Sequence, residues 1–133
     1  MSQANVEIVK RAIDAFNRRD VEGLIELTTA DFKWFPAMPG IVAGDSFNGR
    51  EGVEQYFAGL AETWVEYRSI VEEFRDLGDS VLMLGQLEGR GRGSGAAVAA
   101  PQGTVCEFRG VRISVIRTYL DHADALKAVG LGE

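Results

Sequence analysis

The sequence predicts an α+β domain in which helices pack on one face of a strongly curved antiparallel sheet. Three observations support this prediction: helical periodicity dominates the chain up to Trp64, the apolar period changes there, and residues 65–120 have the pattern of four successive strands. Such a sheet curls around the helices to bury their apolar faces, which leaves a cone-shaped cavity. A length of 133 residues suits one hydrophobic core, so we expect a single domain over residues 1–133.

The first elements are two helices and a strand. Apolar residues at helical spacing predict a helix over residues 2–20, and Asp20 suits the N-cap of a shorter helix that follows. Residues 31–36 are aromatic and end at a proline, which predicts a short strand.

Residues 36–49 are rich in Pro, Gly and small side chains and are typical of a loop. Asn48 stands three residues before Glu51, a relative of the capping box, and predicts the start of a third helix. The apolar stripe of this helix runs from Val53 to Trp64.

The C-terminal half predicts four strands and a last short helix. Tight turns are expected at residues 77–79 and 109–110, and the glycine-rich residues 89–95 would close the middle hairpin. The predicted strands are residues 65–77, 79–89, 95–109 and 111–120, and the predicted helix is residues 121–131.

The composition of the chain disfavours two classes of binding partner. The net charge is -6, which disfavours nucleic acid and anionic membrane surfaces. The single cysteine excludes an internal disulfide, and no apolar run approaches the roughly 20 residues needed to span a bilayer. We therefore expect a cytoplasmic protein that binds neither nucleic acid nor membrane.

The order of elements resembles the SnoaL-like branch of the nuclear transport factor 2-like superfamily, which has the ketosteroid isomerase-like fold. The resemblance covers nearly the whole chain and is carried by NVEIVKRAIDAFNRRDVEGLIEL, FNGREGVEQYFAGL and VIRTYLDHADALKAVGL. It implies an α+β barrel with a conical cavity. It does not imply one reaction, because the superfamily includes isomerases, cyclases, hydrolases and non-catalytic binding modules.

The ketosteroid isomerase branch offers a test at the level of residues. Its oxyanion hole uses a tyrosine and an aspartic acid, and another aspartate moves the proton. The corresponding positions in this sequence hold Ala12, Thr104 (or Val105) and Phe35, so that chemistry is not expected.

Carried over by position, the resemblance implies a largely apolar cavity with Tyr56 and Thr118 as polar groups. Such a lining suits a hydrophobic or aromatic small molecule. Trp34 and Phe35 are both included, although strand alternation places them on opposite faces. The implied lining is Phe16, Trp34, Phe35, Met38, Tyr56, Leu60, Met83, Leu87, Cys106, Thr118 and Leu120.

Asp121 and His122 are the candidate acid-base residues. Adjacent residues do not face each other on a helix, so the carboxylate is poorly placed to orient the only histidine of the chain. Asp121 also stands where the last strand should end and the last helix begin, which favours an N-cap. The alternative is a catalytic Asp121 at the cavity mouth, as in SnoaL-like cyclases.

Other candidate chemistry is weaker. One histidine and no HExxH motif give no metal site of recognisable spacing. Residues 91–96 match a dinucleotide fingerprint formally, but Pro101 lies where the required helix would continue, so no cofactor is expected. Cys106 has the character of a buried apolar residue rather than a nucleophile. Arg117 would pair with Glu73 or Asp76 on the outer sheet face, or bind an acidic substrate in the pocket.

Two functions remain open from the sequence. One is a cofactor-independent isomerase, cyclase or hydrolase acting on a hydrophobic metabolite, and the other is a non-catalytic ligand-binding or scaffold module. A homodimer is also expected, because superfamily members commonly pair through the outer sheet face. In this sequence that face is predicted to carry the apolar side chains of Val111, Ile113, Val115 and Tyr119.

Overall fold

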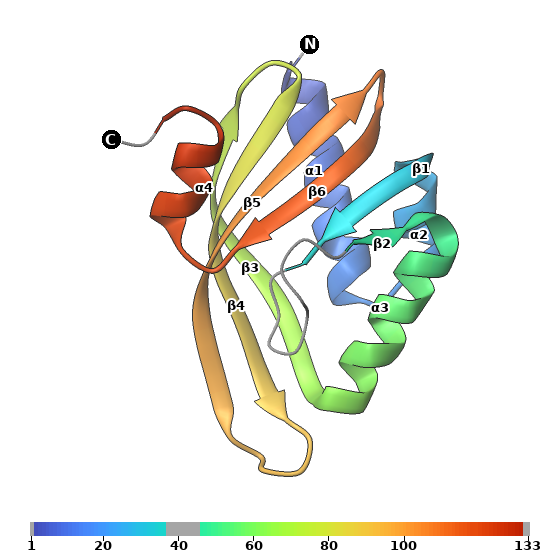
Figure 1. Ribbon diagram of the computed structural model, residues 1–133, viewed down its shortest axis with the longest axis vertical. Helices are drawn as coiled ribbons and strands as arrows, with labels where there is room; N and C mark the ends of the chain where they lie inside the picture. The colour runs from blue at the N-terminus through green and yellow to red at the C-terminus, as the bar shows by residue number, and fades with distance from the viewer. Residues whose placement is uncertain (1, 37–45, 132–133) are drawn as a thin grey trace.

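The computed structural model describes residues 2–36 and 46–131, and it shows an α+β arrangement (Figure 1). Each predicted strand of the C-terminal half is present, with ends within a few residues of the expected ones. Among the described helices, none is both long and apolar enough to cross a bilayer. The elements are α1 (Ser2–Asn17), α2 (Val21–Glu26), β1 (Thr28–Phe35), β2 (Phe47–Asn48), α3 (Gly49–Thr63), β3 (Trp64–Asp76), β4 (Ser80–Gly91), β5 (Ala97–Arg109), β6 (Arg112–Tyr119) and α4 (His122–Ala128).

The strands form one curved, open sheet in the order β2-β1-β6-β5-β4-β3. The long strands β3 to β6 are antiparallel hairpin neighbours, as predicted. The pairing of β1 with β6 is parallel, which the sequence did not indicate. Hairpin turns fix strand direction only between neighbours in the chain, whereas four other strands separate β1 from β6.

The side-chain cap predicted for α2 is present, whereas the one predicted for α3 is absent. The Asp20 carboxylate accepts a hydrogen bond from the Gly23 amide at 2.9 Å and caps α2, as predicted. Asn48 occupies the N-cap position of α3, but its side chain makes no cap hydrogen bond. Its Oδ1 accepts instead from the Ser46 hydroxyl at 3.0 Å.

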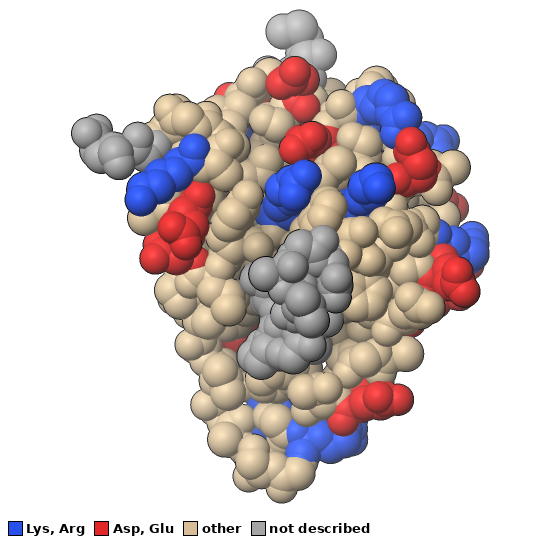
Figure 2. All heavy atoms as spheres, in the orientation of Figure 1, with Lys and Arg blue, Asp and Glu red and all other residues tan. Residues whose placement is uncertain are grey.

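The two faces of the sheet bury separate apolar clusters. Helices α1, α2 and α3 cover the concave face, where the larger cluster includes Phe32, Val53 and Ile113, all fully buried. Helix α4 covers part of the convex face over a smaller cluster that contains Leu82 and Ala125. In the face shown in Figure 2, basic and acidic side chains lie interspersed, so charge is not segregated there.

Helix α4 packs closely because β5 carries a glycine beneath it. A Cβ atom at Gly103 would lie 2.3 Å from the Cβ atom of Ala125, far inside van der Waals contact. The missing side chain therefore lets α4 approach the strand directly.

The side chains that we predicted for the outer face of the last strand do not all lie there, and this prediction is wrong. Glu107 pairs with Val115 and Phe108 with Ile113, so Ser114 is an extra residue on β6 and forms a bulge. The bulge reverses the alternation, and Ile113 is consequently buried in the concave cluster. Tyr119 packs against the cluster beneath α4. Dimerisation through the sheet stays a prediction, with a smaller apolar area than the sequence suggested.

Candidate functional site

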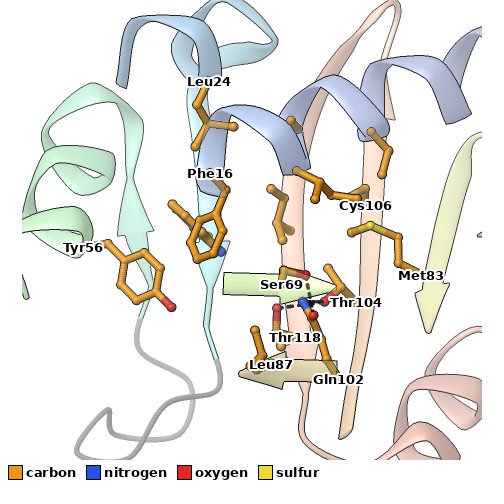
Figure 3. Close-up of a pocket in the computed structure, with 15 residues that line it drawn as sticks. Phe16, Leu24, Tyr56, Ser69, Met83, Leu87, Gln102, Thr104, Cys106 and Thr118 are labelled. Carbon is orange, nitrogen blue, oxygen red and sulfur yellow. Dashed lines mark hydrogen bonds between the residues drawn. The ribbon is translucent and has the colours of Figure 1, made fainter. Parts of the chain in front are cut away.

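A cavity lies between the concave sheet face and helices α1, α2 and α3 (Figure 3). Its volume, measured as the space open to the centres of water-sized molecules, is about 60 Å³. One water needs roughly 10–15 Å³ on this measure, so the space holds about four to six waters. The lining residues are Val9, Ala12, Ile13, Phe16, Leu24, Trp34, Tyr56, Ser69, Met83, Leu87, Gln102, Thr104, Cys106, Ile116 and Thr118.

A chain of four polar side chains crosses the sheet wall of the cavity, shown by dashed lines in Figure 3. The Ser69 hydroxyl donates to Gln102 Oε1 at 2.6 Å. Gln102 Nε2 donates to Thr104 Oγ1 at 2.8 Å, and Thr104 Oγ1 lies 3.1 Å from Thr118 Oγ1. The chain links β3, β5 and β6, and it is the polar feature of an otherwise apolar lining.

Asn17 fixes the β3 end of this polar chain. Its Nδ2 donates to the Ser69 carbonyl at 3.0 Å, and its Oδ1 accepts from the Ser69 amide at 2.9 Å. This bidentate contact ties the end of α1 to β3 and holds the Ser69 backbone in register with the cavity.

Aromatic rings form the opposite wall. Trp34 meets Tyr56 edge to face with ring centroids 4.4 Å apart, and Phe16 lies 5.8 Å from Trp34. The Tyr56 and Tyr67 hydroxyls are hydrogen-bonded to each other. Outside this wall, the Arg19 guanidinium lies 4.9 Å from the Phe16 ring centroid and donates to the Phe16 carbonyl at 2.6 Å.

The titratable groups of the described lining stay neutral at physiological pH. Burial raises the pKa of the Cys106 thiol to about 12. Burial is also the main cause that raises the pKa of Tyr56 above its ordinary value. Among the described lining residues there is no Asp, Glu, His, Lys or Arg. The cavity therefore offers hydrogen bonds and apolar contact, and none of these side chains exchanges a proton readily near pH 7.

Seven of the expected lining residues come together around the cavity. These residues are Phe16, Trp34, Tyr56, Met83, Leu87, Cys106 and Thr118. They lie on the faces of the helices and strands that turn toward the cavity. Met38, which was also expected, lies outside the described residues.

Three expected residues lie elsewhere. Phe35 alternates with Trp34 and turns to the other sheet face, where the Arg117 guanidinium lies 4.2 Å from its ring centroid. Leu60 is 1% exposed within the core one helical turn beyond Tyr56, because the apolar stripe of α3 is longer than the cavity. Leu120 is 43% exposed, because the chain leaves β6 at Tyr119 and strand alternation ends there.

Asp121 is the N-cap of α4. Its carboxylate accepts from the Ala123 amide at 2.7 Å, and the residue is exposed. The ring of His122 contacts the Gly85 carbonyl through Nε2 at 2.9 Å. With Leu120 these residues border a separate depression over β4 and β5, and they do not line the cavity. The geometry gives Asp121 a structural role.

Arg117 has a different partner from those expected. Its Nε lies 4.0 Å from Glu107 Oε2 across the β5–β6 pair, and the side chain is exposed. The bulge at Ser114 sets this register, so the sequence could not supply the pairing.

Ser69 and Gln102 were missed as site residues. Gln102 shares strand parity with Thr104 and Cys106, so period-two alternation along β5 was a usable signal. Ser69 carried no such signal, because its approach to Gln102 depends on the curvature of the sheet across β4.

Comparison with known proteins identifies the family. The model of the SnoaL-like domain matches residues 9–116, and the chain belongs to that family. No curated protein matches the sequence significantly. The assignment to this family is therefore based on the domain match, and the fold is consistent with it.

Solved structures share the fold across nearly the whole chain. An NTF2-like protein of unknown function from Burkholderia pseudomallei is 22% identical, with a TM-score of 0.79 over 96% of this chain and 98% of that one. A Catenulispora acidiphila protein with a ketosteroid isomerase-like fold, in complex with trimethylamine, is 22% identical, with a TM-score of 0.75 over 94% and 93%. A putative SnoaL-like polyketide cyclase from Shewanella denitrificans is 18% identical, with a TM-score of 0.75 over 93% and 97%.

Proposed function

We propose that this protein is a binding module for a small, neutral, mainly apolar molecule, which it holds in the cavity without acid-base catalysis. The observation that carries the proposal is the lining of the cavity. It has apolar and aromatic side chains and four linked neutral polar groups, and none of its described residues is readily ionised. A charged ligand would lose its hydration there without gaining a counter-ion.

The volume limits the ligand to at most about one ring. The space of about 60 Å³ is smaller than the roughly 150 Å³ cavity that admits benzene, so a single-ring ligand would have to displace lining side chains outward. Polycyclic molecules of the kind that a polyketide cyclase handles exceed this space. A solved protein of the same fold, in complex with trimethylamine, supports the small size of the proposed ligand but not its neutral charge.

A cofactor-independent enzyme is the alternative function. Proton transfer needs a group whose pKa lies near the working pH and which reaches the substrate. The resemblance assigns the oxyanion-hole positions of ketosteroid isomerases to Ala12 and Thr104 (or Val105), which cannot supply an acid. Ala12 and Thr104 line the cavity, and Phe35 is turned away from it. This arrangement favours binding over isomerisation.

The proposal is tested by titrating the protein with cyclohexanone and following Trp34 fluorescence. Saturable one-to-one binding is expected, because Trp34 borders the cavity. Ala12→Leu should abolish binding by filling the cavity, whereas Ala4→Leu adds the same atoms at an exposed position of α1 and should preserve it. Absence of saturation, or equal binding by both variants, would contradict the proposal.

A further inference from the structure

We infer that the Thr118 hydroxyl donates a hydrogen bond to the ligand, so that the cavity selects molecules carrying an acceptor, such as the carbonyl oxygen of a small cyclic ketone. The inference rests on the proposed function, because it assigns the polar end of the bound molecule. It follows from the direction in which the four-residue chain of hydrogen bonds runs.

The first step of the chain runs from Ser69 to Gln102. Gln102 Oε1 is a carbonyl oxygen and cannot donate, so the contact at 2.6 Å uses the hydroxyl hydrogen of Ser69. Ser69 is 6% exposed, and this bond satisfies its one donor. The Gln102 amide then donates to Thr104 Oγ1 at 2.8 Å.

The second step runs from Thr104 to Thr118. Thr104 Oγ1 already accepts from Gln102, and its own hydrogen needs an acceptor because the residue is only 1% exposed. A buried donor left unpaired carries its full desolvation cost. Within the described residues, Thr118 Oγ1 at 3.1 Å is the side-chain oxygen in position to accept that hydrogen.

The chain therefore ends in an unused donor. In the described part of the protein, the Thr118 hydroxyl contacts Thr104 and has no acceptor for its own hydrogen. Thr118 is half-buried and lines the cavity. The reverse direction would leave the unpaired hydrogen on Ser69, which is more deeply buried, so burial favours the direction that ends at Thr118.

The alignment of the bonds adds to selectivity. Successive donors in one direction polarise one another, which strengthens the final hydroxyl as a donor. A ligand without an acceptor leaves that hydrogen unpaired in a largely apolar space, and sites of this kind discriminate strongly against such molecules. The ring of the ligand would lie against the aromatic wall of Phe16, Trp34 and Tyr56.

The test compares two probes of the same shape, cyclohexanone and methylenecyclohexane, by NMR-detected titration of the wild type, Thr118→Val and Thr118→Ser. Thr118→Val should weaken cyclohexanone about 3- to 10-fold and change methylenecyclohexane less than about twofold. Thr118→Ser keeps the hydroxyl and should bind both like the wild type. Comparing each probe with itself cancels the different hydration of the free probes.

Other results would overturn the inference. Equal effects of Thr118→Val on both probes would show that Thr118 does not read the acceptor, although binding of both would leave the proposed function standing. Selective loss of cyclohexanone in Ser69→Ala instead would show that the chain runs the other way. Failure of both probes to saturate the wild type would contradict the proposed function itself. Thr118→Ala is a second hydroxyl-free variant should Thr118→Val fold poorly.

Discussion

The concave and convex faces of the sheet both bury apolar side chains, but they pack them differently. On the concave face, large side chains from three helices and the sheet surround a space of about 60 Å³. On the convex face, α4 presses Ala125 against Gly103 so closely that not even a methyl group fits between them. One face thus keeps room for a ligand, and the other uses close packing to hold the end of the chain.

Polar groups follow the same division. The concave face carries buried, neutral groups that bond mainly to one another. The acid-base candidates at the convex face, Asp121 and His122, bond to backbone groups of α4 and β4. The acid-base residues singled out from the sequence therefore lie on the closely packed convex face. The polar residues that line the cavity belong to no recognisable sequence motif.

The largest expected effect is a loss of folding stability at alkaline pH, which comes from a buried thiol on the concave face. The pKa of Cys106 rises from 9.0 to about 12 on folding because the thiol is buried. Between these values the unfolded chain has lost a proton that the folded chain keeps, so the free energy of unfolding falls as pH rises, by at most about 1.4 kcal/mol per pH unit.

Cys106→Ala should flatten this decline, as measured by urea denaturation at several pH values from 8 upward. Tyr67, with a pKa raised to about 12, should preserve part of the slope in the variant. An identical slope in wild type and Cys106→Ala would contradict the burial argument.

Gly103→Val should lower the free energy of unfolding by about 1–3 kcal/mol, because the added atoms overlap Ala125 and displace α4. Ala99→Val is the matched control: it lies on the same strand and face but is exposed. Chemical denaturation of both variants would measure the difference, and equal losses would mean that α4 is not closely packed.

Asp121→Ala should cost about 0.5–2 kcal/mol through loss of the cap, whereas Asp121→Asn should cost much less because asparagine caps nearly as well. Thermal denaturation of both variants tests this. If the two substitutions destabilised the protein equally, charge rather than capping would explain the role of Asp121.

Ala12→Leu adds three carbon atoms to the concave face, as Gly103→Val does to the convex face. Because the cavity receives the added atoms, we expect a change in unfolding free energy within about 1 kcal/mol, despite the loss of ligand binding. A loss as large as that of Gly103→Val would show that the concave face has no usable room.

The sequence predicted most of the fold because periodicity and turn residues are local signals. The strands of residues 65–120 and the Asp20 cap were visible in it, whereas the places of Phe16, Tyr56 and Cys106 at the cavity came from the family resemblance. The parallel pairing of β1 was not visible, because no turn specifies it. The bulge at Ser114 was not visible in the sequence either. Because of this one extra residue, Ile113 lies on the concave face and not on the outer face that we predicted.

The polar chain escaped prediction for a related reason. Gln102 and Thr104 alternate inward on one strand, but Ser69 and Thr118 reach them from other strands. Such contacts depend on register and curvature, which arise only when the whole sheet is assembled.

The most direct test of ligand binding in the cavity is to locate a bound neutral probe by NMR, using intermolecular NOEs from cyclohexanone to assigned side chains. We expect contacts with Trp34, Met83 and Thr118, which border the cavity from β1, β4 and β6. Contacts confined to Leu120 and His122, in the depression beside α4, would contradict it.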